Sequence, residues 1–292
     1  MTGLAKVALV KAGEDTETSV RRAVDLAGGL QIGQAKRAII KPNICNAKNP
    51  QGMVITDFNI VGAAVKMIRE RGCEALVVES DNIADTADKR IKESGLAAKL
   101  EEWDVPFLNL SKDECVPRKV AGTEIMIPKT MLEADYVLNL AKIKTCAHTT
   151  VTLGIKNLIG CIKEAKKSRL HKRLDEVLPY LAKTIRTDMT IIDGLTCMEG
   201  NGPVVGNPRK MGVIVAGSDV VAVDSFCCGL MGFNPEEIGH VSNTAMLGVG
   251  QISDYEVIGD PWEGFVCQFE HPYSLKATIK SLGAVRDIYL KR

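Results

Sequence analysis

The sequence predicts an α/β protein with a mostly parallel sheet and helices on both faces. Short apolar runs that read as buried strands alternate with amphipathic helical segments along the chain. The run 133–144, EADYVLNLAKIK, has almost no polar interruption, which is typical of a strand covered on both faces. A chain of 292 residues, 46% of them apolar, can hold one large domain or two lobes. We treat residues 1–292 as one domain and leave open a smaller lobe inserted near the middle, with no defined boundaries.

The N-terminal part is expected to alternate between strand and helix. Its predicted strands are 5–12, 36–43 and 74–80, and its predicted helices are 14–29 and 57–72. Gly28 and Gly29 end the first helix, while Asp57 is a plausible N-cap and Gly72 a plausible stop for the second. This order is the pattern of a βαβ unit with parallel strands.

The same alternation continues to the end of the chain. Further strands are predicted at 105–110, 133–144, 189–194, 210–217 and 254–259, and further helices at 84–95, 96–103, 151–166, 173–186, 219–232 and 235–247. Ser218 or Asp219 is a suitable N-cap for the helix 219–232. This structural role accounts for at least one of the two carboxylates Asp219 and Asp224, so a catalytic role is not needed to explain it.

Composition restricts the class of protein and its partners. Lys and Arg number 37 against 36 Asp and Glu, so we expect no nucleic-acid partner, and any electropositive site must be local. The start lacks an apolar signal segment and no later run approaches a membrane span, so we expect a cytoplasmic protein with no membrane partner. Nine cysteines are an odd number without a small-domain framework, which favours reduced thiols in a reducing, anaerobic cell. The composition is also compatible with an oligomeric protein.

Lysines mark the first candidate site, around the strand 133–144. Lys142 and Lys144 share parity, so both ammonium groups should lie on one face, where they repel unless an anion or a carboxylate lies between them. The carboxyl end of a strand and the start of a helix together favour anions. We therefore predict a phosphate or carboxylate site, with Lys144 and His148 as catalytic candidates and the following residues as binding candidates: Lys142, Thr152, Lys156 and Asn157. Lys163, Lys166 and Lys167 are interpreted as solvated side chains on the outer face of the helix.

The second candidate segment is 191–208, IIDGLTCMEGNGPVVGNP. Its glycines allow the backbone to approach a ligand closely, but the GxGxxG spacing of a dinucleotide site is absent. The binding candidates here are Gly200, Asn201, Gly202 and Gly206. Asp193 and Glu199 are candidate carboxylates for general-base catalysis or a divalent cation, and a tight turn capped by Asp193 is an equal alternative.

The third candidate segment begins with KPNIC at 41–45. Lys41 and Asn43 follow a buried strand and are predicted to bind the ligand at the same edge of the sheet. Cys45, Cys146 and Cys197 each lie just beyond a predicted strand, and Cys161 lies in the adjacent helix. If these four thiols converge, they are candidate ligands for an iron–sulfur cluster or another soft metal. No CxxC spacing supports that, so buried free cysteines remain the alternative.

Several ordered motifs together resemble a known family. KPN after a strand, NLAKIKT followed by VTLGIKNLIG, then DGLTCMEGNGPVVGNP and SDVVAVD, resemble the prokaryotic family called domain of unknown function 362, over nearly the whole chain. The resemblance implies a link to anaerobes and to iron–sulfur chemistry, because many members carry an appended ferredoxin-like module. Residues 271–292 hold no cysteine, so electrons would come from a separate ferredoxin. Members often have a histidine where this chain has Cys146.

Three functions follow as hypotheses. The first is an intracellular enzyme of anaerobic metabolism that binds a small anionic molecule at the carboxyl edge of the sheet, with a cluster or divalent metal on the four thiols. The second is a non-catalytic carrier or assembly factor for a cluster, a metal or a phosphorylated cofactor. The third is a lysine-dependent racemase or lyase without metal, which needs one lysine of lowered pKa.

Overall fold

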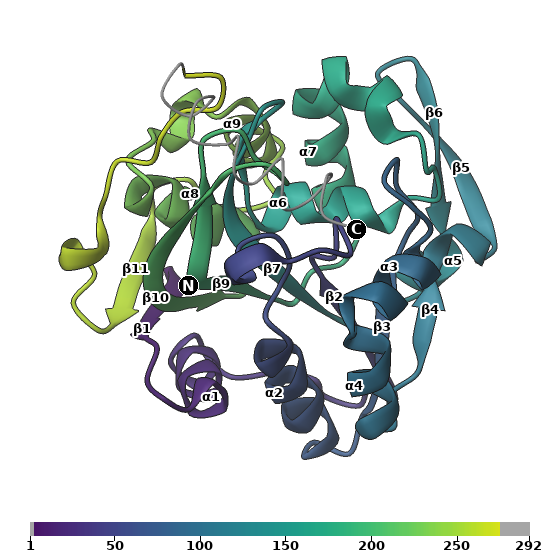
Figure 1. Cartoon of the computed structure of the whole chain (residues 1–292), viewed down its shortest axis with the longest axis horizontal. Helices are drawn as coiled ribbons and strands as arrows, with labels where there is room; N and C mark the ends of the chain where they lie inside the picture. The colour runs from purple at the N-terminus through teal and green to yellow at the C-terminus, as the bar shows by residue number, and fades with distance from the viewer. Residues whose placement is uncertain (1–2, 275–292) are drawn as a thin grey trace.

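The computed structural model describes residues 3–274, and a nine-stranded sheet forms its centre (Figure 1). The strands follow one another across the sheet in the order β11-β1-β10-β9-β7-β2-β3-β4, and β8 pairs with β7. Their bounds are β1 Ala5–Lys11, β2 Arg37–Pro42, β3 Glu74–Glu79, β4 Phe107–Asn109, β7 Tyr136–Cys146, β8 Thr150–Thr152, β9 Met189–Glu199, β10 Asn207–Gly217 and β11 Tyr255–Gly259.

Parallel pairs dominate the sheet, as the sequence predicted. The run from β9 through β7, β2 and β3 to β4 is parallel throughout, and β1 is parallel to β11. β10 is antiparallel to both of its neighbours, β1 and β9, and β8 is antiparallel to β7. The order also reverses once: the chain runs outward from β2 to β3 and β4, then returns to place β7 on the other side of β2.

Helices cover both faces of the sheet, as Figure 1 shows. The α-helices are α1 Thr16–Leu26, α2 Phe58–Arg69, α3 Ala87–Ser94, α4 Leu96–Glu102, α5 Lys129–Leu132, α6 Gly154–Asn157, α7 Leu174–Thr184, α8 Val220–Leu230 and α9 Gly239–Met246. The 3-10 helices are η1 Pro50–Gly52, η2 Leu110–Lys112, η3 Leu158–Cys161, η4 Lys167–Arg173, η5 Pro235–Glu237 and η6 Glu263–Phe265. None of the helices within residues 3–274 is both long and apolar enough to cross a membrane.

Two hydrophobic cores lie on opposite faces of the sheet. Successive strand residues divide between them: Ala8 and Ile40 pack with α1, α2 and α4, whereas Leu9 and Ile39 pack with α6 to α9. This is the side-chain alternation expected of a strand that is buried on both sides. The N-cap predicted at Asp57 is confirmed, because its side chain accepts the Asn59 N–H at the start of α2. Of the two N-caps considered for α8, Ser218 and Asp219, the structure has Asp219, which accepts the N–H groups of Val221 and Ala222.

The helix predicted over 151–166 is wrong. Thr150–Thr152 instead pairs with the end of β7, and only α6 and η3 are helical before Ile162 returns to an extended conformation. Close packing explains the difference: a Cβ on Gly154 would lie 2.9 Å from Asp224 Oδ1, and one on Gly160 would lie 2.6 Å from Lys41 Nζ. Tertiary contacts at these glycines therefore override the apolar period on which the prediction relied.

A hairpin that the sequence analysis did not predict lies outside the main sheet. β5 (Cys115–Val120) pairs with β6 (Thr123–Pro128) in antiparallel register, and both turn residues, Ala121 and Gly122, have positive φ. Segment 275–292, part of the cysteine-free C-terminal stretch, lies outside the described residues.

Candidate functional site

The candidate site lies where the strand order of the sheet reverses. β2 and β7 are parallel neighbours, and the chain leaves their carboxyl ends in different directions. Open α/β sheets bind ligands in the crevice at such a position. Here the crevice contains an inner cavity of about 100 Å³ that shares lining residues with an outer cleft of about 660 Å³. The segment from β8 to η4 forms one wall of both spaces.

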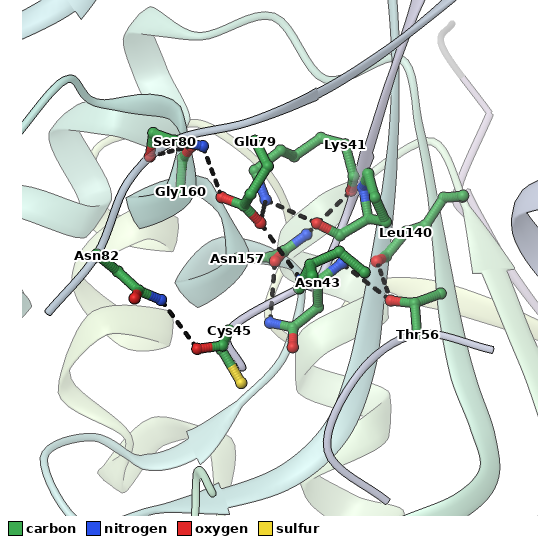
Figure 2. Close-up of polar contacts among 12 residues, drawn as sticks. Lys41, Asn43, Cys45, Thr56, Glu79, Ser80, Asn82, Leu140, Asn157 and Gly160 are labelled. Atoms are coloured by element: carbon green, nitrogen blue, oxygen red, sulfur yellow. Dashed lines mark hydrogen bonds and ion pairs between the residues drawn. The ribbon is translucent and has the colours of Figure 1, made fainter. Parts of the chain in front are cut away.

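Five cationic side chains line the inner cavity: Lys41, Arg90, Lys144, Lys156 and Lys167. Glu79 is the one carboxylate in its lining within residues 3–274. Lys41 Nζ lies 2.9 Å from Glu79 Oε2 (Figure 2). It also donates to the Pro42 carbonyl at 2.7 Å. Burial alone would raise the pKa of Glu79, but Lys41, Arg90 and Lys167 together lower it, so the carboxylate stays ionised.

Ser80 holds two of the cations in place. The Arg90 guanidinium donates to the carbonyls of Ser80 and Ile44, and Lys167 Nζ donates to Ser80 Oγ at 2.6 Å and to the Asp81 carbonyl at 2.8 Å. Burial, with Lys41 and Arg90 nearby, lowers the pKa of Lys167 to about 7 despite the attraction of Glu79. Lys167 therefore belongs to the site, contrary to its interpretation as a solvated surface residue.

A network of asparagines joins β2, β7 and α6. Asn43 Nδ2 donates to Asn157 Oδ1 at 3.1 Å, and Asn157 Nδ2 donates to the Lys41 carbonyl (Figure 2). Asn157 Nδ2 also donates to Asn139 Oδ1. Lys144 Nζ has three acceptors in this region: Asn43 Oδ1 at 2.8 Å, the Val54 carbonyl at 2.8 Å and Cys45 Sγ at 3.3 Å. All three protons of the Lys144 ammonium are thus used within the protein.

Lys156 and Thr152 differ from these residues because they retain unused donors. Thr152 is 4% exposed and lines the cavity, yet its hydroxyl has no hydrogen-bond partner in the described part of the chain. Lys156 forms no ion pair with any residue between 3 and 274. Burial and the neighbouring Lys144 lower the pKa of Lys156, and Cys146 opposes that shift. The buried Thr152 hydroxyl is unfavourable without a partner, and the half-buried Lys156 ammonium lines the same cavity, so both groups favour an acceptor there.

Comparison with known proteins assigns a family to this chain. Residues 39–229, which include every residue of the inner cavity, match the family model described as Domain of unknown function (DUF362). The chain belongs to the DUF362 family. A thylakoid-associated protein of Synechocystis sp., sll1697, is 28% identical over 240 residues, which cover 79% of this chain and 74% of that protein.

A solved structure also aligns with this DUF362 protein. It is the lactate racemase apoprotein from Thermoanaerobacterium thermosaccharolyticum, with 12% identity and a TM-score of 0.41. The alignment covers 85% of this chain, which spans only 57% of the length of that racemase. A similarity of this size carries no functional argument.

The Cys146 thiol faces the cationic cavity of the DUF362 protein and also lines the outer cleft. Burial disfavours its thiolate, but Lys156 and hydrogen bonds from Thr149 and the His148 backbone outweigh that effect and lower the pKa. Cys161 and Cys197 differ: burial raises the pKa of Cys161 to about 12 and raises that of Cys197 as well. Cys146 is thus the most easily ionised of these three thiols.

Iodoacetamide at neutral pH should therefore alkylate Cys146 before Cys161 and Cys197, as followed by peptide mass spectrometry. Replacing Lys156 with methionine should slow the labelling of Cys146 by roughly three- to tenfold, because the neighbouring positive charge no longer favours the thiolate. Lys163→Met, which removes an exposed lysine from the same stretch, is the control and should leave the rate unchanged. Equal rates for the three thiols would contradict the proposed ionisation of Cys146.

Two stacked histidines form part of the outer cleft. The ring centroids of His148 and His171 lie 3.8 Å apart. Burial and Lys156 lower the pKa of His148, and burial, His148 and Lys156 lower that of His171 to about 4. Both imidazoles are therefore neutral at pH 7, and neither adds to the positive charge of the site.

The structure brings together part of the predicted site. Of the predicted residues, those that line the inner cavity are Lys41, Asn43, Cys45, Lys144, Cys146, Thr152, Lys156 and Asn157. His148 lines the outer cleft. Lys142 and Asp193 form a separate ion pair at 2.7 Å in which both side chains are fully buried. Lys144 Nζ donates to the Val54 carbonyl, and Lys142 Nζ donates to Asp193, whose carboxylate also accepts the Asp57 N–H. Both ammonium groups therefore lie near segment 43–57, which agrees with the shared parity of the two lysines.

The glycine-rich loop packs beside the site and contributes little to its lining. Glu199 pairs with Arg209 at 2.6 Å, and Asn201 Oδ1 accepts from the Tyr273 backbone. Gly200 has a φ of 77°, and Cβ atoms on Gly202 and Gly206 would clash with Thr145 and Met198, so these glycines serve packing. From this segment, Pro203 and Val204 reach the cavity or the cleft.

The four predicted thiols do not meet as a set. Cys45 and Cys146 line both spaces, whereas Cys161 and Cys197 are fully buried and belong to the hydrophobic core that faces α6 to α9. Between residues 3 and 274, no three side chains of His, Cys, Asp or Glu are grouped so that they could hold a metal ion.

Sequence reasoning missed Glu79, Ser80 and Arg90. Glu79 and Ser80 follow the apolar residues of β3, just as Lys41 follows those of β2, so the rule that found Lys41 would also have found them. Arg90 lies in a helix among other charged residues, and its side chain is only 1% exposed because it enters the crevice. The sequence carries no signal for that burial.

Proposed function

We propose that this protein binds a small anion, a phosphate or a carboxylate, in the inner cavity and acts on the molecule that carries it. One observation carries the proposal: five cationic side chains and one carboxylate surround a cavity of about 100 Å³. Like charges gathered in a buried space repel one another, and an anion among them removes that cost. Burial is the main cause of the lowered pKa values of Lys156 and Lys167, and neighbouring cations, Lys144 for Lys156 and Lys41 and Arg90 for Lys167, lower them further.

The direct contacts in this proposal are Thr152, Lys156 and Lys167. Thr152 and Lys156 have unused donors, and Lys167 uses two of its three protons on Ser80 and Asp81. Lys41, Arg90 and Lys144 are bonded to the protein and contribute mainly charge. At the mouth of the cavity, neutral His148 and Cys146, whose lowered pKa favours ionisation, are the groups that can accept a proton from the bound molecule.

Sulfate titration across pH tests the proposal, because sulfate keeps both its charges over this range. Lys167 has a pKa of about 7 and faces Glu79, Lys41, Arg90 and Cys161. It loses its proton as the pH rises through that value, so sulfate affinity should fall about tenfold between pH 6 and pH 8 in calorimetry. Lys167→Met should weaken binding at pH 6 and flatten the pH dependence. Absence of sulfate, phosphate and acetate binding at any pH would refute the proposal.

A lysine enzyme is the second candidate, because the pKa values of Lys156 and Lys167 are lowered and a free amine can attack a carbonyl. Such an attack forms an imine and releases water. Incubation with pyruvate followed by borohydride would reduce the imine to a stable secondary amine on one of these lysines. Peptide mass spectrometry detects that product, and its absence removes this candidate.

Metal or cluster binding has weaker support. Cys45, Cys146, His148 and His171 line one cleft, but they do not form a ligand group, so we propose no chemistry that depends on a metal and no carrier role. Measuring iron, sulfide, nickel and zinc in protein purified without oxygen tests this choice. Stoichiometric metal that disappears in a Cys45→Ala, Cys146→Ala double variant would favour the carrier or cluster hypothesis.

A further inference from the structure

We propose that the anion is the phosphate group of a phosphomonoester whose planar or apolar body lies in the outer cleft. This inference rests on the proposed function and adds the class of ligand. The two spaces adjoin each other, because Cys146, Lys156, Ile159 and Lys167 line both of them. A molecule bound through its phosphate at the inner end would therefore extend directly into the cleft.

The volumes indicate a ligand larger than a free anion. The inner cavity, about 100 Å³, suits a compact group, and the outer cleft is about 660 Å³. Clefts of a few hundred to about a thousand Å³ typically hold an organic molecule of drug or cofactor size. Inorganic phosphate alone would leave most of this space to water.

The chemistry of the lining changes from the inner end to the outer cleft. Cations dominate the inner end, and Arg90, Lys156 and Lys167 also border the outer cleft. The residues that line only the outer cleft add the apolar side chains of Ile83, Leu174 and Val204 and the neutral imidazoles of His148 and His171, and their charges, Lys48, Asp85 and Glu93, are of both signs. Ile83 is 79% exposed, so this large apolar side chain has little cover within residues 3–274. A charged head and an apolar or aromatic body match this division, and they fix the direction in which the ligand enters.

The inner donors favour phosphate over carboxylate. Three separate donors, the Thr152 hydroxyl and the Lys156 and Lys167 ammonium groups, line the same cavity. A phosphomonoester offers three terminal oxygens and close to two negative charges, whereas a carboxylate offers two oxygens and one charge. The larger number of oxygens and charges can satisfy more of the cations that surround the cavity.

Calorimetric titration of the full chain at pH 6 with inorganic phosphate, phenyl phosphate, benzoate and phenol tests the inference. We expect phenyl phosphate to bind at least about tenfold more tightly than inorganic phosphate, because the ring leaves water for an apolar cleft. Benzoate should bind more weakly than phenyl phosphate, and phenol should not bind measurably.

A matched pair of variants locates the ring. Ile83→Ser should reduce the advantage of phenyl phosphate over inorganic phosphate several-fold while leaving inorganic phosphate binding unchanged. Leu4→Ser removes another exposed apolar side chain, 64% exposed, outside the cleft and should change neither. His171→Ala provides a second test of the outer wall, with the same expected loss for phenyl phosphate alone.

The outcomes separate this inference from the proposed function. Equal affinity for inorganic and phenyl phosphate would overturn the inference and leave the anion site intact. Tighter binding of benzoate than of phenyl phosphate would overturn the choice of phosphate. Failure of every anion to bind would refute the proposed function itself.

Discussion

Lys156→Met is expected to weaken sulfate binding by about 10- to 150-fold, with little change in stability. A hydrogen bond from a charged group is worth about 1.5–3 kcal/mol, which corresponds to that range of affinity. Lys156 is the cation of the inner cavity that has neither a hydrogen bond nor an ion pair with a carboxylate among residues 3–274, so its removal breaks no such contact and removes only the charge that favours the Cys146 thiolate. It also relieves repulsion with Lys144 in the unliganded protein. Calorimetric titration at pH 6 gives the affinity, and urea unfolding gives the stability.

Lys163→Met is the matched control, because Lys163 belongs to the same stretch and its side chain is exposed. Its removal should change sulfate affinity less than twofold if charge at the cavity, and not the total charge of the protein, determines binding. Equal losses in the two variants would place the anion elsewhere.

Lys144→Met should differ from both, since Lys144 supports Asn43 and segment 43–57 and its loss should lower stability as well as affinity.

Much of the fold follows from local sequence signals. Strands buried on both faces are nearly all apolar and helices have an apolar stripe, so alternation along the chain predicts a mostly parallel sheet. The N-caps at Asp57 and Asp219 are equally local. The helix prediction for the segment after β7 was wrong because a periodic pattern of apolar residues carries no information about tertiary contacts. It cannot reveal that Gly160 lies against Lys41 and Glu79, or that Thr150–Thr152 pairs with β7.

The candidate site was predictable where it follows strand ends and unpredictable where it depends on packing. Lys41, Lys144 and Cys146 lie at or beside the carboxyl ends of parallel neighbours, so their position along the chain places them at one edge. Lys167 and Arg90 reach the cavity from helices on either side, and their charge alone suggests a solvated surface. Only the three-dimensional arrangement shows that Ser80 binds both.

Asp193→Leu is expected to destabilise the protein by about 3–5 kcal/mol, because it leaves the Lys142 ammonium charged and buried without its partner. Asp193 also accepts the backbone N–H groups of Asp57, at the start of α2, and of Leu195. Its three donors are thus all internal, and neither Asp193 nor Lys142 lines the inner cavity or the outer cleft. Urea unfolding at pH 7 measures the loss. A fully stable variant would contradict this structural role and favour the catalytic role predicted for Asp193 from the sequence.

The double variant Lys142→Met, Asp193→Leu distinguishes a lost ion pair from lost packing. Removing both charges eliminates the unpaired ammonium, so the double variant should recover much of the stability that the single variant loses. The loss of stability that remains in the double variant measures the cost of the two backbone N–H groups left without an acceptor. That cost is about 1–3 kcal/mol for each buried group. Because the pair lies in the sheet beside Lys144 and not in the cavity, sulfate affinity of the double variant should stay within about threefold of that of the unaltered protein. A larger loss would mean that the ion pair positions the lysines of the site as well as the sheet.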